Sequence, residues 1–181
     1  MSIESSQPVT QSVAVETQRT ICDWALNTFG PSGSNLRVAA RANEEMAELL
    51  RAVTAKAPWH DILEEAADVL IVLARVGERL CVELEFQPVT LKPLSPRATI
   101  KQAVCGVNRN IAYLLDTLAL DNPAQERLLD AWYSLLRLIK HMGGDAQAVV
   151  DAKMAKNRKR VWNHDGTGHG YHLRDKQTLD T

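Results

Sequence analysis

The sequence contains only three cysteines and has no long apolar run. The cysteines, Cys22, Cys81 and Cys105, are widely spaced and form no C-x-x-C pair, so neither a disulfide framework nor a zinc ribbon is indicated. The longest apolar run, from Val69 to Ala74, is too short to span a bilayer, and the polar N-terminus lacks the apolar segment of a signal peptide. We therefore expect a cytoplasmic protein in a reducing environment, without membrane contact.

An excess of charge of either sign is also missing. The 21 Lys and Arg residues nearly balance the 22 Asp and Glu residues, which gives a net charge of -1. Proteins that hold nucleic acid along their surface are usually basic, so we expect no stable nucleic-acid binding. Phosphate binding would have to come from a local patch, and the segment 153–176 offers one, with seven Lys or Arg and two Asp.

An apolar rhythm of 3.6 residues runs through most of the chain and predicts about six helices. Segments with glycine or proline, which interrupt helices, separate the predicted helices; examples are Gly30-Pro31-Ser32-Gly33, the three prolines in 87–96, and Gly143-Gly144. The expected helices cover about 13–29, 35–54, 58–84, 97–118, 121–141 and 145–161. This pattern predicts an all-α fold, an antiparallel helical bundle over residues 1–162, followed by a Gly/His-rich tail over 163–181 in loop or extended conformation.

Two of these helices carry carboxylates beside their apolar stripes. On helical wheels Glu45 lies at the edge of the stripe, with Glu48 one step further round, and Glu65 lies inside the stripe of the next helix, with Asp68 at its edge. Residues three apart point to the same side, so each helix presents a pair of carboxylates.

Burying several ionised carboxylates together costs free energy unless protons, Lys or Arg, or a divalent cation compensates the charge. All the donors are oxygens, which suits Mg²⁺ or Mn²⁺. The rival interpretation is a buried ionic network that uses Arg41, Arg51 or Arg75. A ferritin-like di-iron site is disfavoured, because no His follows these glutamates at the third position.

The motif Glu44-Glu45-x-x-Glu48, then 16 residues, then Glu65-x-x-Asp68 resembles the E-E-x-x-E … E-x-x-D motif of the MazG-like all-α nucleoside triphosphate pyrophosphohydrolases. Lys153-x-x-x-Asn157-x-x-Arg160 is similar to a run that many relatives place near the substrate phosphates. The opening Trp24 … Thr28-Phe29-Gly30 and the tail 165–172 resemble the phage-type branch, the MazZ-like deoxypurine triphosphate diphosphohydrolases. The segment 87–142 carries no such motif.

The resemblance implies the reaction (d)NTP + H₂O → (d)NMP + diphosphate on dGTP or dATP, with two or more Mg²⁺ or Mn²⁺ per active site, in a homo-dimer or homo-tetramer (in the host cytoplasm for a phage protein). It implies that the metal ligands are Glu45, Glu48, Glu65 and Asp68, with Glu44 as a further ligand or as the residue that orients the attacking water. Glu64 and Asp61 rank below these. The implied phosphate and substrate contacts are Lys153, Asn157, Arg160, Lys156, Trp24 and Tyr171.

Several alternatives stay open at this point. Trp24, Phe29 and Trp59 could stack on a base or could simply pack in the core or an interface. The glycines at 166, 168 and 170 could let the tail fold over the substrate. Helices over 97–141 could form a subunit interface or the intramolecular core. The whole chain could also be a non-catalytic helical scaffold that binds a nucleotide or a protein, which metal dependence would distinguish from an enzyme.

Overall fold

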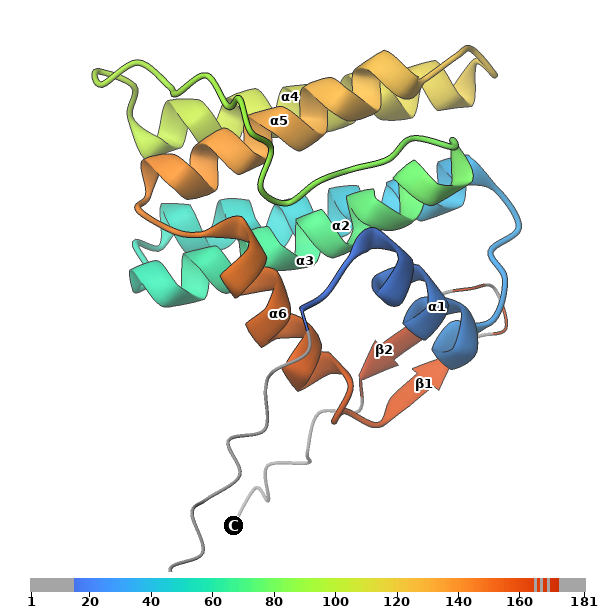
Figure 1. Cartoon of the computed structure of the whole chain (residues 1–181). Coiled ribbons are helices and arrows are strands. Elements are labelled where there is room, and N and C mark those ends of the chain that lie inside the picture. Colours follow the sequence, from blue (N-terminus) through green and yellow to red (C-terminus); the bar gives the residue numbers. More distant parts are fainter. Residues whose placement is uncertain (1–14, 165, 167, 169, 173–181) are drawn as a thin grey trace, which may run out of the picture.

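Helices make up most of the part of the chain that the computed structural model describes, namely residues 15–164, 166, 168 and 170–172 (Figure 1). The side chains of residues 164, 171 and 172 are outside this description. The helices in these residues are α1 (Gln18–Phe29), α2 (Asn35–Thr54), α3 (Trp59–Arg79), α4 (Ile100–Ala119), α5 (Gln125–His141) and α6 (Ala146–Asn157). The prediction of an all-α bundle is confirmed.

The helices are arranged as two packed pairs with two further helices on one side (Figure 1). α2 packs against α3, and α4 packs against α5. The pairs contact each other through α2 with α4 and α3 with α5, while α1 and α6 pack against α3. The chain turns between the helices of each pair within a few residues, so each pair is antiparallel.

The core lies between the two pairs. Val104, Val107, Ile111 and Leu114 on α4 are fully or almost fully buried within the chain itself, so the apolar face of this helix belongs to the intramolecular core. Trp132 on α5 is also buried. Its indole N–H donates to the carbonyl of Glu85 over 3.1 Å, and its ring lies 5.2 Å from that of Phe86. These two contacts hold the long connection between α3 and α4 against α5.

Several helix ends differ from the predicted ones. α3 ends at Arg79 rather than near Leu84, because Cys81 adopts the left-handed conformation (φ +55°) and Val82 N–H donates to the carbonyl of Gly77 over 2.9 Å. This closes the helix with a non-glycine residue at a position where glycine is the usual signal. α1 begins at Gln18 because the side chain of Thr17 caps it, and residues 13 and 14 lie outside the described residues.

The C-terminal segment forms a small antiparallel ladder of β1 (Trp162–His164) and β2 (Gly170–His172). It packs against the end of α1 and the following loop. A Cβ added at Gly170 would lie 2.7 Å from the Phe29 ring, and one added at Gly168 would lie 2.5 Å from the Cα of Ser32. The glycines therefore allow close packing of this segment on the helical body.

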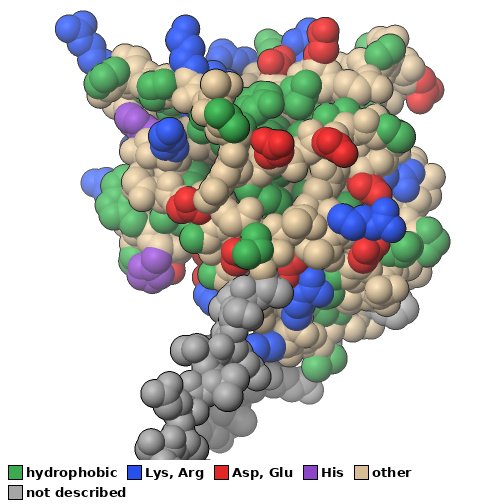
Figure 2. Space-filling model, in the orientation of Figure 1, with side chains coloured by type: hydrophobic (Ala, Val, Ile, Leu, Met, Phe, Trp, Pro, Cys, Tyr) green, Lys and Arg blue, Asp and Glu red, His purple; other side chains and the backbone are tan. Residues whose placement is uncertain are grey.

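Charged side chains of both signs are interspersed over the face of the molecule in Figure 2, and neither sign forms a continuous patch there. Among the described residues, no helix combines the length and the apolar character needed to cross a membrane.

Candidate functional site

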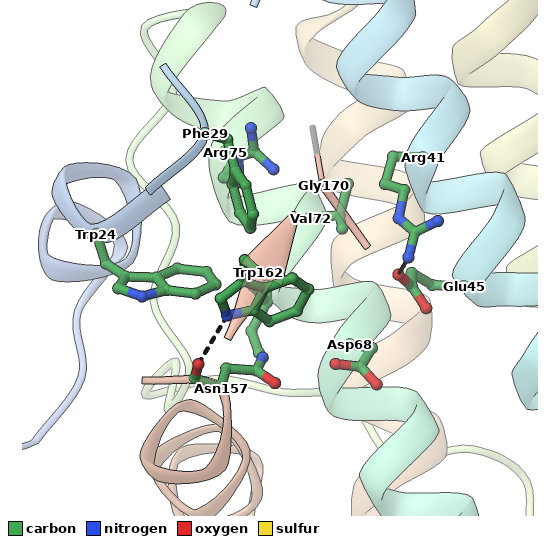
Figure 3. A pocket seen from close by; sticks show the side chains of 11 residues that line it. Trp24, Phe29, Arg41, Glu45, Asp68, Val72, Arg75, Asn157, Trp162 and Gly170 are labelled. Atoms are coloured by element: carbon green, nitrogen blue, oxygen red, sulfur yellow. Dashed lines mark hydrogen bonds and ion pairs between the residues drawn. The ribbon is translucent and has the colours of Figure 1, made fainter. Parts of the chain in front are cut away.

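A pocket opens where α2, α3, the end of α6 and the C-terminal ladder meet (Figure 3). It encloses about 410 Å³ of free space, part of which is open to solvent. Carboxylates from α2 and α3 lie on one side of the pocket, and aromatic rings from α1 and β1 lie on the other. The lining residues are Trp24, Phe29, Arg41, Glu45, Asp68, Ile71, Val72, Arg75, Asn157, Trp162 and Gly170.

Glu45 is the most deeply buried carboxylate of the predicted ligand set, with 7% of its surface exposed. Its Oε1 lies 2.5 Å from Nη2 of Arg41. Burial, with smaller contributions from the negative charges of Asp68 and Glu48, raises the pKa of Glu45 to about 7 against the opposing charges of Arg41 and Lys153. Asp68 and Glu48 therefore lie close enough to Glu45 to repel its negative charge.

Asp68, on α3, is paired with Lys153 from α6. The Lys153 Nζ lies 2.5 Å from Asp68 Oδ2 and 3.1 Å from Glu64 Oε1, and only 5% of the lysine is exposed. Burial raises the pKa of Asp68 despite the adjacent ammonium. Burial would also raise the pKa of Glu64, but Lys156 and Lys153 together hold it below its ordinary value.

The remaining predicted acidic residues are less buried. Glu65 is half-buried, and burial and the charge of Asp68 raise its pKa; it has no ion-pair partner among the described residues. Glu48 is exposed and lies 3.2 Å from Arg51. Glu44 is 63% exposed and contacts Arg41. Asp61 is exposed and contacts the neighbouring His60, so its position in the structure is outside the cluster.

The carboxylate cluster of Glu45, Glu48, Glu65 and Asp68 suits a hard divalent cation, because all its donors are carboxylate oxygens. Burial, with repulsion from neighbouring carboxylates, raises the pKa values of three of these groups, all but Glu48. In the arrangement seen here, however, no three acidic, His or Cys side chains of the described residues are grouped so that they could hold a metal ion. The inner oxygens contact Lys153 and Arg41 instead. The rival ionic network is therefore present in part, with Arg41 and Arg51 as members.

Three aromatic rings form the opposite wall. Trp24, Phe29 and Trp162 pack edge to face, with ring centroids 5.2–5.8 Å apart. The sequence analysis singled out the first two but missed Trp162, which follows the last predicted helix and belongs to no motif. Trp59 is 57% exposed and lines a different surface hollow beside Val53.

The end of α6 closes the pocket between these two walls. Asn157 is 3% exposed and lines the pocket, and its Oδ1 accepts a hydrogen bond of 2.9 Å from Arg160. The positive charge of Arg160 partly opposes the rise in the pKa of Asp68, so Arg160 as well as Asn157 lies near the carboxylates. The side chain of Tyr171 lies outside the described residues.

α6 is held in place by Glu16, in the segment before α1. Arg158 donates twice to the Glu16 carboxylate over 2.9 Å, and the Glu16 N–H donates to Asp151 over 2.8 Å. The carbonyl of Glu16 accepts from Gln147 over 2.8 Å. These contacts fix α6, and with it Lys153 and Asn157, relative to the rest of the site.

Arg75 brings a further positive charge to the pocket. Its guanidinium donates to the carbonyl of Gly168 over 2.8 Å and lies 5.7 Å from the centroid of the Phe29 ring. Burial lowers the pKa of Arg75, and no carboxylate among the described residues is paired with it. A partly buried cation without a paired carboxylate favours a ligand that supplies acceptor atoms. From the sequence, Arg75 is expected only as a member of an ionic network.

Comparison with known proteins adds no further assignment. No protein-family model, no curated protein and no solved structure matches this chain.

Proposed function

We propose that the protein is a Mg²⁺- or Mn²⁺-dependent nucleoside triphosphate pyrophosphohydrolase of the MazG-like kind that acts in the cytoplasm. The reaction would be (d)NTP + H₂O → (d)NMP + diphosphate. The observation that carries the proposal is one pocket with buried carboxylates from two helices on one side and aromatic rings on the other. Such a pocket offers one side for a metal-bound polyphosphate and the other for a base.

Glu45, Glu48, Glu65 and Asp68 would hold the cations, which reduce the repulsion between phosphate oxygens and water and make a bound water more acidic. The raised pKa values of Glu45, Glu65 and Asp68 support this role, because they result chiefly from burial of negative charge, which a divalent cation would compensate. Glu44, at the exposed edge of the cluster, would orient the attacking water and accept its proton.

The other side of the pocket supports the substrate class. Trp24, Phe29 and Trp162 would contact the base, and Arg75 would supply hydrogen-bond donors beside them. Asn157 and Arg160, close to Asp68, would contact the phosphates. The preference for dGTP and dATP follows from the resemblance of Trp24 to Gly30 and of the tail, and so does assembly into a homo-dimer or homo-tetramer.

A panel of dNTPs and NTPs, with Mg²⁺ or Mn²⁺, tests the proposal when monophosphate and diphosphate are both quantified. Asp68→Asn and Glu48→Gln should each lower turnover by at least about 100-fold, as loss of groups that hold or orient a metal does. Asp116→Asn, on the exposed face of α4, is the matched control and should keep full turnover. Full turnover in both site variants, with unchanged helical content, would refute the proposal.

The second candidate is a non-catalytic scaffold that binds a nucleotide or a protein. The ion pairs of Arg41 with Glu45 and of Lys153 with Asp68 favour it, because they compensate the inner carboxylates without any added cation. A scaffold of this kind should bind dGTP equally well in EDTA and in Mg²⁺, whereas the enzyme should lose affinity in EDTA.

A further inference from the structure

Two inner carboxylates of the proposed site already contact cations that belong to the chain itself. Lys153 contacts Asp68 and Glu64, and Arg41 contacts Glu45. Because Lys153 is almost fully buried, its ammonium depends on these carboxylates rather than on bulk water. A divalent cation bound to Asp68 would take one of the two carboxylate partners of this buried ammonium and leave it with Glu64 alone.

The charges of the network lead to the same expectation. Its carboxylates outnumber its cations by six to four, so its net charge is -2; the members are Glu44, Glu45, Glu48, Glu64, Glu65, Asp68, Arg41, Arg51, Lys153 and Lys156. Two divalent cations alone would change this charge to +2. A triphosphate with about four negative charges would restore it to -2, because phosphate oxygens carry the compensating charge.

Lys153 is placed where it can change partners. Lys153 lines a separate hollow with Glu64 and Lys156, and its ammonium lies 2.5 Å from Asp68, which lines the pocket. Asn157, one turn further along α6, lines the pocket directly. The lysine stem is flexible and its ammonium has three donors, so a small rotation exchanges a carboxylate oxygen for a phosphate oxygen.

We propose that Lys153 and Arg41 act as resident cations of the site and exchange their carboxylate partners for phosphate oxygens when a metal–triphosphate complex binds. This rests on the function proposed above. The site then takes up the divalent cation together with the polyphosphate and discriminates against the free cation. Lys153 binds substrate phosphate in this scheme, and it links occupation of the carboxylates to the presence of a triphosphate.

Mn²⁺ binding to the full chain, followed by electron paramagnetic resonance and calorimetry, tests the exchange without turnover. The ligand is MnCl₂ alone or with the α,β-imido analogue of dGTP, which is not cleaved. For the wild type, Mn²⁺ should bind at least about 10-fold more tightly with the analogue than alone, a coupling of ordinary size for linked sites. The wild-type measurement stands even where a variant folds poorly.

Lys153→Gln should shift the two affinities in opposite directions. Mn²⁺ alone should bind about 10-fold more tightly than to the wild type, because the competing ammonium is gone, and Mn²⁺ with the analogue should bind about 10-fold more weakly. Lys159→Gln removes the same charge from an exposed position just beyond α6 and should change neither affinity.

The possible failures are distinguishable. Tight binding of free Mn²⁺ to the wild type, or a Lys153→Gln variant that loses affinity in both conditions, overturns the exchange and leaves the proposed enzyme intact. Absence of Mn²⁺ binding even with the analogue overturns the proposed function itself, and the exchange with it.

Discussion

Replacement of Glu45 by Gln should stabilise the metal-free protein at alkaline pH. Glu45 has a pKa of about 7 in the folded protein, chiefly because of burial, against 4.5 for an ordinary glutamate. A group whose pKa is raised by folding contributes stability that is complete below the unfolded value and is lost as the pH rises through the folded value. The wild type should therefore lose stability between about pH 4.5 and pH 7 through this residue.

The size of the effect follows from the shift. At 1.36 kcal/mol per pKa unit, a rise to about 7 corresponds to roughly 3 kcal/mol as an upper bound, since the pocket is partly open to water. Glu45→Gln cannot ionise, so it should be more stable than the wild type by up to that amount at pH 8 and nearly equal to it at pH 4.5. Arg41 keeps Glu44 as a partner in the variant, which limits the loss from the broken ion pair.

Urea denaturation in EDTA at pH 4.5, 6 and 8 measures this difference, with far-ultraviolet circular dichroism as the probe. Glu83→Gln, an exposed position between α3 and α4, is the matched control and should show no such dependence. A Glu45→Gln variant that is no more stable than the wild type at pH 8, or an advantage that does not shrink toward pH 4.5, would refute the reasoning.

Two further predictions concern the elements that surround the site. Glu16→Gln should destabilise the protein by about 1–3 kcal/mol at pH 7, because it weakens the charged hydrogen bonds with Arg158. The pKa of Glu16 is lowered by Arg158 despite burial, so the loss of stability in the variant should be complete above pH 4.5 and should vanish as the pH falls below the folded pKa of Glu16. Urea denaturation at pH 7 and pH 3 measures this dependence. An equal loss of stability at pH 7 and pH 3 would contradict the assignment. Gly170→Ala should shift the C-terminal ladder away from Phe29, because the new Cβ would lie 2.7 Å from the Phe29 ring and from the carbonyl of Asn163. The variant should therefore bind the uncleaved nucleotide analogue more weakly, as measured by calorimetry. Gly106→Ala, where the added Cβ meets open space, should bind the analogue as the wild type does.

Much of the architecture could be predicted from the periodicity of the sequence. The apolar rhythm indicates the helices because most of their apolar residues are buried along one face. The wheels place Glu45 at the edge of the stripe and Glu65 inside it, whereas the structure buries Glu45 and leaves Glu65 half-buried. The ends of the helices were harder to predict from the sequence. Cys81 closes α3 in a left-handed conformation that only its tertiary surroundings select.

Contacts between distant segments could not be predicted in the same way. The spacing of Lys153 and Asn157 indicates that they share a helix face, but it does not tell which helix that face meets. Arg160 was predicted on the same helix but lies beyond its end, because α6 ends at Asn157. In the structure Lys153 contacts α3 carboxylates, and Asn157 reaches the pocket. Trp162 and Arg75 meet at the pocket only because the chain returns past α1 after α6, and local sequence patterns do not encode that return.

The division of the bundle into two helix pairs separates two kinds of sensitivity to mutation. The described walls of the pocket come from α1, α2, α3, the end of α6 and the C-terminal ladder, whereas α4 and α5 supply the buried packing behind them. Random substitutions in the outer pair should therefore be recorded mainly as changes in melting temperature or protein yield. Substitutions at the polar pocket-lining positions of the other elements should change ligand binding at unchanged yield, so a deep mutational scan with separate abundance and binding selections should separate these positions from the packing positions of α4 and α5.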